Sequence, residues 1–195
     1  MGRIIAGRAK GMRILAPKGD ATRPTTDRVR EALFSALVTW FDTADEAPGE
    51  QLEGVRVLDL FAGSGAVGLE AASRGAARVL AVDNRTAGII RDNAARTGLR
   101  VEVASAKAEA VVTAAADRFD LVFIDPPYDF TPESVNRLLA LLIEHGRLAS
   151  ESLVVVERSK RSAAPSWPDG FTRTWRRDYG ETTLHFGAFE GEENA

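Results

Sequence analysis

The chain has 195 residues, 45% of them apolar and 27% charged, which is enough for one full hydrophobic core and a small appendage. It contains no cysteine, which excludes disulfides, thiolate metal sites and cysteine nucleophiles, and no apolar run has the length of a signal peptide or a membrane span. We therefore expect a soluble cytoplasmic protein, and the eight Lys or Arg against two Asp in residues 1–30 predict either a polyanion partner or a solvated basic arm.

The first predicted element is a β-hairpin. Residues 3–15 hold two short β-prone runs around a loop that begins at Gly7 and ends at Gly11. An isolated hairpin is only marginally stable in water, so this one should pack on the main body or on a partner. We therefore divide the chain into a hairpin extension at residues 1–22 and a main domain at residues 23–195.

A helix is predicted next. Asp27 has the position of an N-cap, and apolar residues recur at helical spacing from Val29 to Trp40, which gives one stripe that should face the core. The acidic residues 42–54, with their Gly and Pro, are typical of a surface connection ahead of the main sheet.

From Val55 onward, predicted strands and helices alternate. Strands are expected at 55–61, 78–83, 99–104, 119–125 and 152–158, and helices near 66–73, 85–97, 107–116 and from the cap Thr131 to 144. The runs 171–178 and 182–189 then form a terminal hairpin. This order predicts an α/β fold with a mostly parallel seven-stranded sheet, one antiparallel C-terminal strand and helices on both faces.

A glycine-rich turn follows the strand at 55–61. Gly63-Ser64-Gly65-Ala66-Val67-Gly68 fits the pattern GxGxxG, and Asp83 lies twenty residues after Gly63, as in dinucleotide-binding proteins. Asp59, however, precedes the turn, where a carboxylate would hold an ammonium group but repel a pyrophosphate. S-adenosylmethionine has such an ammonium and a ribose diol for Asp83, so we predict that cofactor and keep an NAD-dependent oxidoreductase as an alternative.

A second special segment, Asp125-Pro126-Pro127-Tyr128, ends the strand at 119–125. An exocyclic base amine is a poor nucleophile because its lone pair is delocalised into the ring. The Asp125 carboxylate and the Pro126 carbonyl can accept its two hydrogens, two prolines stiffen the loop, and Tyr128 can stack on an extruded base. The segment therefore predicts methyl transfer to a nucleobase amine.

The segments together resemble a known family. Three of them resemble the first, second and fourth motifs of class I amino-methyltransferases: Asp59–Gly65, Ala81–Asn84 and Asp125–Tyr128. Flanking segments resemble the RsmD family of bacterial 16S rRNA guanine-N2 methyltransferases, with Ala6 in place of the family's Gly: Arg3–Gly7, Arg23–Thr25, Asp27–Phe34 and Tyr179–Thr182. The resemblance covers nearly the whole chain. It implies a Rossmann-like methyltransferase domain and an activity of the type that methylates guanine 966 of 16S rRNA.

Residue roles follow from this resemblance. The expected catalytic residues are Asp125, Pro126, Pro127 and Tyr128. The expected cofactor-binding residues are Asp59, Phe61, Ala62, Gly63, Ser64, Gly65, Asp83, Asn84, Ser105 and Ala106. RNA contacts are expected from the basic N-terminal residues Arg3, Arg8, Lys10, Arg13, Arg23 and Arg28. No metal is expected.

The expected partner is 16S rRNA within an assembled or assembling small ribosomal subunit, approached by a monomer and not by a membrane protein. Two other interpretations remain open. The same chemistry would serve an N6-adenine DNA methyltransferase or a protein-glutamine methyltransferase, although no sizeable target-recognition domain is apparent. A non-catalytic ribosome assembly or RNA-binding factor would retain the fold without the reaction.

Overall fold

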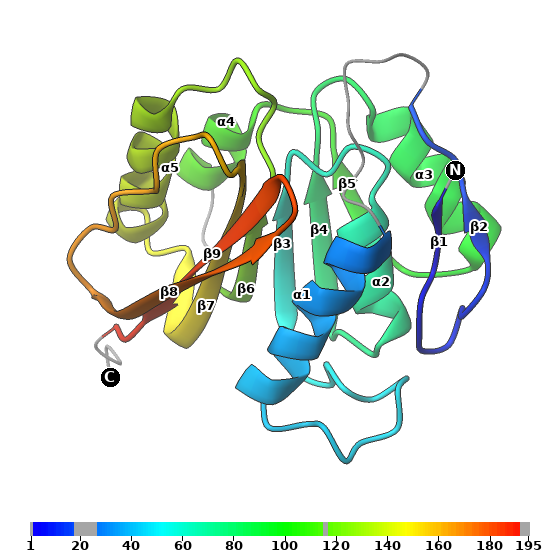
Figure 1. Ribbon diagram of the computed structural model, residues 1–195. Helices are drawn as coiled ribbons and strands as arrows, with labels where there is room; N and C mark the ends of the chain where they lie inside the picture. The colour runs from blue at the N-terminus through cyan, green and yellow to red at the C-terminus, as the bar shows by residue number, and fades with distance from the viewer. Residues whose placement is uncertain (1, 18–26, 115–116, 192–195) are drawn as a thin grey trace.

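The computed structural model describes residues 2–17, 27–114 and 117–191 (Figure 1). Its elements in chain order are β1 (Gly2–Arg3), β2 (Arg13–Ile14), α1 (Asp27–Trp40), β3 (Arg56–Leu60), α2 (Ala66–Ser73), β4 (Arg78–Val82), α3 (Ala87–Thr97), β5 (Glu102–Ala104), α4 (Ala108–Thr113), β6 (Phe119–Ile124), α5 (Pro132–Glu144), β7 (Leu148–Ser159), β8 (Phe171–Tyr179) and β9 (Thr182–Phe189).

The main sheet has seven strands in the order β5-β4-β3-β6-β7-β9-β8. The strands from β5 to β7 pair in parallel, and β9 is antiparallel to both of its neighbours. This confirms the predicted α/β fold with its antiparallel C-terminal strand. The chain passes from β3 through β4 to β5 and then returns to β6 on the other side of β3. The order therefore reverses between β3 and β6, where open α/β sheets bind their ligands.

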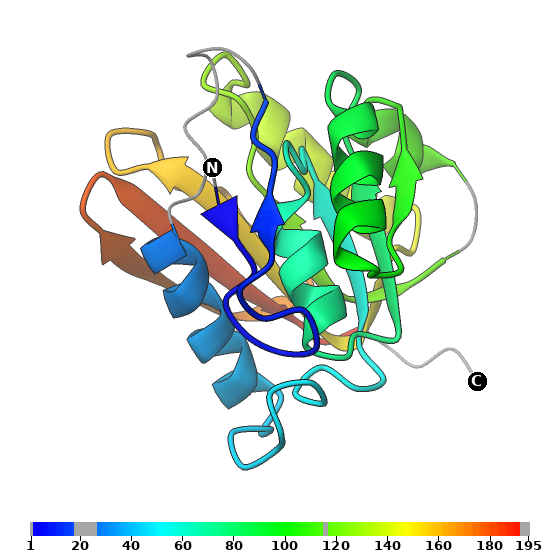
Figure 2. The same cartoon turned by 90° about the vertical axis from the view of Figure 1, so that its right-hand side faces the viewer.

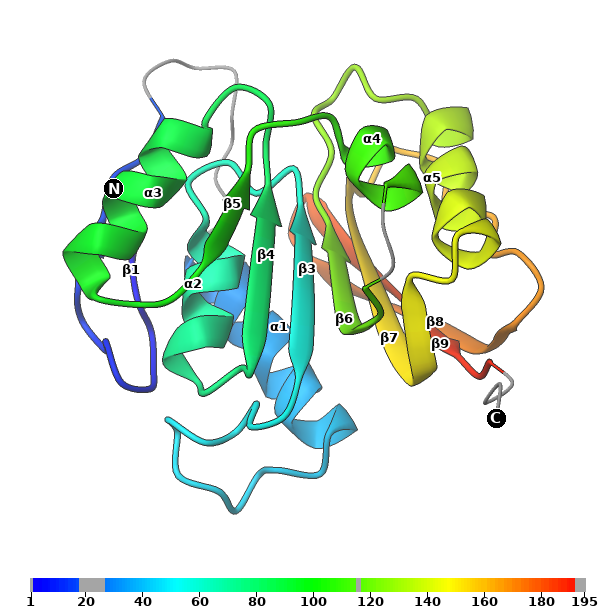
Figure 3. The same cartoon turned by 180° about the vertical axis from the view of Figure 1, so that it is seen from behind.

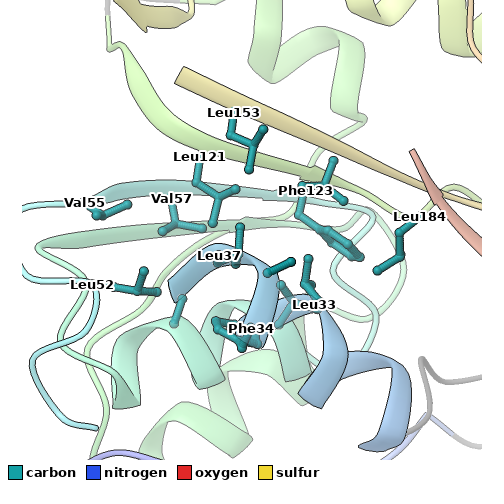
Figure 4. Close-up of a cluster of buried hydrophobic side chains, with 14 of the residues drawn as sticks. Leu33, Phe34, Leu37, Leu52, Val55, Val57, Leu121, Phe123, Leu153 and Leu184 are labelled. Carbon is teal, nitrogen blue, oxygen red and sulfur yellow. The ribbon is translucent and has the colours of Figure 1, made fainter. Parts of the chain in front are cut away.

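Helices cover both faces of the sheet, so most of its strands are buried on two sides. On one face, α1 and α2 pack on the strands, and Val67 of α2 belongs to the same buried cluster. Figure 4 shows Leu33, Phe34 and Leu37 of α1 against Val57, Leu121, Phe123 and Leu153 of the sheet. On the other face, α4 and α5 lie over the sheet (Figure 3), with Val112, Leu138 and Leu142 against Leu58, Val122 and Val154. This arrangement explains the continuous apolar runs in the sequence.

The N-terminal hairpin is docked on the main body, beside α2 (Figure 2). Its Ile4, Ala9 and Ile14 are buried with Leu69 of α2. Buried polar side chains hold its backbone as well. Glu70 accepts the N–H groups of Ile5 and Ala6 at 2.7 and 3.0 Å, and Ser73 Oγ accepts that of Ala9 at 3.0 Å.

The loop of the hairpin lies at the amino-terminal edge of the sheet. Gly7, with φ of +80°, approaches α2 so closely that a Cβ atom would lie 1.9 Å from the carbonyl oxygen of Ser73, so only glycine fits there. Ser73 is the last residue of α2, and α2 begins at the opposite edge. Figure 1 shows the arrowheads of β3 and β4 pointing away from this loop.

The observed elements differ from the predicted ones mainly at their ends. β7 begins at Leu148 rather than residue 152, β5 is limited to Glu102–Ala104, and α4 ends at Thr113. The predicted domain boundary at residues 22 and 23 lies outside the described residues, so the division remains a prediction. In the described part of the chain, no helix is both long and apolar enough to cross a membrane.

Candidate active site

The two special segments follow neighbouring strands. β3 and β6 pair in register up to Leu60 and Ile124, so the segments that follow them leave the same edge of the sheet side by side. Residues of both segments line one open groove with a volume of about 950 Å³, which is the size range of sites for cofactors and drug-sized ligands. The two segments therefore meet at one site.

The turn after β3 has an unusual backbone. Phe61, Gly63 and Gly65 all have left-handed conformations, with φ of 62°, 57° and 76°. A bulky residue such as Phe61 rarely adopts this conformation, and such strain is typical of ligand-binding turns. A Cβ atom on Gly63 would meet nothing closer than 4.0 Å, so this part of the turn is open to a ligand.

Asp59 lies beneath this turn and is only 1% exposed. Its Oδ2 accepts the backbone N–H of Gly68 at 2.9 Å, and a Cβ on Gly68 would lie 3.2 Å from that oxygen. Burial raises the pKa of the Asp59 carboxyl to about 7, against the lowering effect of the Gly68 hydrogen bond, and the charge of Asp83 raises it further. A nearby cation would stabilise the ionised form of Asp59, which burial disfavours.

Asp83 follows β4 and is held by three backbone N–H groups. Its Oδ2 accepts that of Gly63 at 3.1 Å, and its Oδ1 accepts those of Arg85 and Thr86, each at 2.8 Å. The carboxylate therefore fixes the glycine turn to the start of α3 while it lines the groove. These three N–H groups use three of the roughly four acceptor sites of a carboxylate, so a second site on Oδ2 is compatible with accepting a hydroxyl of a diol.

Most, but not all, of the remaining predicted cofactor-binding residues line the groove. Ala62, Ser64, Asn84 and Ala106 line the groove together with Phe61. Gly65 is buried below the turn, where an added Cβ would lie 2.8 Å from Cγ2 of Ile90. It therefore contributes by allowing the backbone to take this conformation rather than by lining the groove. Ser105 is exposed beside the groove rather than being one of its lining residues.

The loop 125–130 forms the other wall of the groove. Pro126 is buried, whereas Tyr128 is 70% exposed. Phe130 donates its N–H to the Pro127 carbonyl at 2.9 Å, which closes the loop into a turn. Its ring meets that of Phe61 edge-to-face at 5.0 Å, so the two walls touch through an aromatic pair.

The predicted RNA-contacting residues do not gather at this groove. Arg3, Arg8, Lys10, Arg13 and Arg28 are exposed, but Arg8 and Lys10 lie on the hairpin loop at the opposite edge of the sheet. Arg23 lies outside the described residues. Their contact with RNA remains a prediction.

Several groove residues were missed by the sequence analysis. Glu157 and Arg158 of β7 line the groove although both are buried, and Tyr179–Thr182 line it as well. The sequence analysis predicted a strand at residues 152–158 and gave Glu157 and Arg158 no role in a site. The rule that ligands bind at the carboxyl ends of parallel strands could have identified the pair, since β7 is the next parallel strand after β6. No cluster of three or more His, Cys, Asp or Glu that could hold a metal ion occurs among the described residues.

The donor set fits S-adenosylmethionine. The open glycine turn allows close approach of a ligand to the backbone, Asp59 suits an ammonium group, and Asp83 at the end of the adjacent strand suits a ribose diol. The strand order, the turn and these two carboxylates together define a class I S-adenosylmethionine-dependent methyltransferase.

Comparisons with known proteins agree with this class and narrow it. Residues 2–188 match the family described as Conserved hypothetical protein 95, the RsmD family, and the chain belongs to that family. The chain is 32% identical over 200 residues to the Ribosomal RNA small subunit methyltransferase D of Escherichia coli K12. The match covers 99% of this chain and 93% of the relative.

Solved structures share the fold, and two of them illustrate the range of similarity. A hypothetical protein of Thermus thermophilus is 31% identical with a TM-score of 0.76, covering 98% of this chain and 100% of that one. The T. thermophilus 16S rRNA N2 G1207 methyltransferase RsmC, solved with AdoMet and guanosine, is 22% identical with a TM-score of 0.61, covering 87% of this chain and 45% of that one.

Proposed function

We propose that this protein methylates the exocyclic N2 amine of one guanine in 16S rRNA. The proposal rests on the amine-orienting loop and the glycine turn facing each other across a single groove. The rRNA substrate is supported by the small-subunit rRNA methyltransferase to which the chain is similar along nearly its whole length.

The residues of the groove have separate tasks in this reaction. S-adenosylmethionine, when bound, supplies an electrophilic methyl group. The Asp125 carboxylate and the Pro126 carbonyl accept the two hydrogens of the target amine and so direct its lone pair, while the exposed Tyr128 ring stacks on the extruded base. Such positioning accounts for roughly 7–11 kcal/mol of a reaction barrier. After transfer the methylated amine is acidic, and Asp125 or water takes its proton.

A second carboxylate favours guanine over adenine. Glu157 is 9% exposed and lines the groove on β7, one position beyond the last residue that pairs with β6. Guanine presents an N1–H donor beside its N2 amine, whereas adenine presents a lone pair at N1. A carboxylate beside Asp125 can accept the guanine N1–H and would repel the adenine N1.

The hairpin supports a polyanion partner. Arg3 and Arg13 are directly opposite in the β1–β2 pair, and both are exposed. Like charges at opposed positions of an antiparallel pair are destabilising unless a counter-charge lies against them. Together with Arg28 they form the basic surface that would contact rRNA phosphates, and the loop residues Arg8 and Lys10 would reach more distant RNA. Arg23 is proposed for the same role from its sequence position alone.

We expect the enzyme to act as a monomer on an assembled or assembling small subunit in the cytoplasm, where ribosomal RNA is modified. The test is incubation with radiolabelled S-adenosylmethionine and small subunits from a strain that lacks the gene, followed by mapping of the labelled nucleotide. Label at one guanine N2 is expected. Label in adenine, DNA or protein glutamine, or no label at all, would contradict the proposal.

The matched variants are Asp125→Ala, which should abolish labelling, and Asp45→Ala, an exposed carboxylate of the 42–54 connection, which should not change it. An Asp125→Ala strain with no rRNA label but normal ribosome assembly would show that transfer is dispensable for assembly. It would then favour a binding role.

A further inference from the structure

Arg158 is a buried arginine in the wall of the groove. It lies near the end of β7 and is only 8% exposed. Its neighbours along the strand, Val154 and Val156, pack in the core under α5. Burial lowers the pKa of its guanidinium, and the charge of Asp125 acts in the opposite direction. Asp125 is therefore an electrostatic partner of this buried cation.

The guanidinium also makes a directed contact with the substrate loop. Arg158 Nη2 donates to the carbonyl oxygen of Phe130 at 3.1 Å. Phe130 is the last residue of the loop 125–130, and its own N–H closes that loop on the Pro127 carbonyl. A single side chain therefore reaches both ends of the loop, by charge at Asp125 and by a hydrogen bond at Phe130.

This contact extends to the cofactor side of the groove. The Phe130 ring packs edge-to-face on Phe61, whose left-handed backbone begins the glycine turn. Holding Phe130 therefore fixes the distance between the amine-orienting loop and the turn across the groove. Methyl transfer needs that distance to be set closely, since a misplacement of about 1 Å can cost about 100-fold in rate.

Burying a guanidinium is costly, and apolar residues of similar volume often stabilise such a position as well or better. On the α5 side of β7 the two positions that precede Arg158 are Val154 and Val156, and an apolar residue at 158 would continue that pattern. The choice of arginine is therefore better explained by what its charge and donors do at the loop than by packing.

We propose that Arg158 is a positioning residue for methyl transfer. Its guanidinium holds the loop 125–130 in register with the glycine turn and places a fixed positive charge beside the carboxylate that orients the amine. The inference rests on the proposed function, because it assigns to the same groove a residue that acts through Asp125 and Phe130 rather than touching the substrate itself.

Two substitutions of Arg158 separate the effect of its charge from the effect of its packing. Arg158→Gln keeps a donor of reduced reach and removes the charge, whereas Arg158→Lys keeps the charge and loses the planar fork. Arg137→Gln, on the exposed face of α5, is the matched control. With small subunits as substrate we expect Arg158→Gln to lower kcat about 100-fold and to change KM for S-adenosylmethionine less than about threefold. Arg158→Lys should recover about tenfold of that loss, and Arg137→Gln should behave as wild type.

The second measurement needs no RNA. Hydrogen exchange of the Tyr128, Asp129 and Phe130 amides in the free protein should be about tenfold faster in Arg158→Gln and unchanged in Arg137→Gln. The inference is overturned if Arg158→Gln retains kcat within about threefold of wild type, if its loss follows cofactor affinity, or if the loop amides exchange as in wild type. Should wild type label a different amine, the proposed function fails, but the variant-to-wild-type ratio and the loop exchange still decide the role of Arg158.

Discussion

Asp59 meets two requirements that oppose each other. It is fully buried beneath the glycine turn, which penalises its ionised form, yet its proposed task is to attract the ammonium group of the cofactor. Its carboxyl pKa is about 7. Between the ordinary Asp pKa near 4 and this value, the folded state binds more protons than the unfolded state, so this residue makes stability fall as pH rises from about 4 to about 7.

Replacing Asp59 by Asn should remove this penalty. The amide oxygen can still accept the Gly68 N–H, and no charge has to be buried. We expect Asp59→Asn to be more stable than wild type by about 4 kcal/mol at pH 8 and to show little difference at pH values near or below about 4, as measured by urea unfolding in both pH ranges. Its affinity for S-adenosylmethionine, measured by calorimetry, should fall at least about tenfold at pH 8.

Equal stability of the two proteins at pH 8 would show that Asp59 is not the group that titrates. Unchanged cofactor affinity would show that it does not face the ammonium.

Gly65 and Gly88 offer a matched pair for the backbone argument. Gly65 has φ of +76°, and an added Cβ would lie 2.8 Å from Ile90, whereas a Cβ on Gly88 in α3 would meet nothing within 4 Å. We expect Gly65→Ala to cost about 2–4 kcal/mol in unfolding free energy and Gly88→Ala to be neutral or slightly stabilising. Thermal unfolding of the two variants measures the difference, and a neutral Gly65→Ala would contradict the strained turn.

At the scale of elements, the hairpin depends on one carboxylate in α2. Glu70 is 0% exposed, accepts two hairpin N–H groups and accepts Arg74 Nε at 2.9 Å. Its position within an Ala-rich helix gives no sign of this task in the sequence. The hairpin extension, which was expected to pack on the main body or on a partner, is thus tied to the main domain through buried polar contacts, which are costly to leave unpaired.

Glu70→Gln should therefore release the hairpin. The amide keeps one acceptor oxygen and loses the charge that balances Arg74, so we expect a loss of about 2–4 kcal/mol. Limited proteolysis should also cleave faster within residues 2–15. Glu31→Gln, an exposed position on α1, is the control and should change neither result. If the hairpin of Glu70→Gln resists protease as in wild type, its docking is held by the apolar contacts alone.

The elements that were predicted well are those whose sequence signals are local. Continuous apolar runs predicted the buried strands. Thr131 caps α5 as expected by accepting the Ser134 N–H, and Gly98, where α3 ends, has a left-handed backbone. The Arg158–Phe130 hydrogen bond and the hydrogen bonds from the hairpin to Glu70 were not predicted, because both join residues far apart in sequence. The hairpin itself was predicted, but its placement along α2 was not, because that placement depends on how closely Gly7 approaches Ser73.

At the scale of the molecule, the exposed basic residues of the hairpin lie outside the lining of the groove. Arg3 and Arg13 face solvent side by side on the hairpin. Each phosphate contact releases condensed counterions, so RNA binding should weaken steeply with salt. We expect the double variant Arg3→Ala and Arg13→Ala to reduce the slope of log affinity against log salt by about 1.5. Filter binding across salt concentrations measures this, with Arg137→Ala as control.

A salt response that is flat in wild type, or the same slope in the double variant, would remove these two arginines from the RNA surface.

Asn93 of α3 gives the molecule a further property. Its Nδ2 donates to the carbonyl oxygens of both Leu15 in the hairpin and Ser64 in the glycine turn, each at 2.9 Å. The hairpin, which is proposed to contact RNA, and the glycine turn, which is proposed to hold the cofactor, thus share one buried amide. If occupation of one site shifts this amide, the affinities at the two sites are linked, and thermodynamic reciprocity requires the same factor in both directions. An enzyme built this way would sense a complete pair of reactants before it reacts.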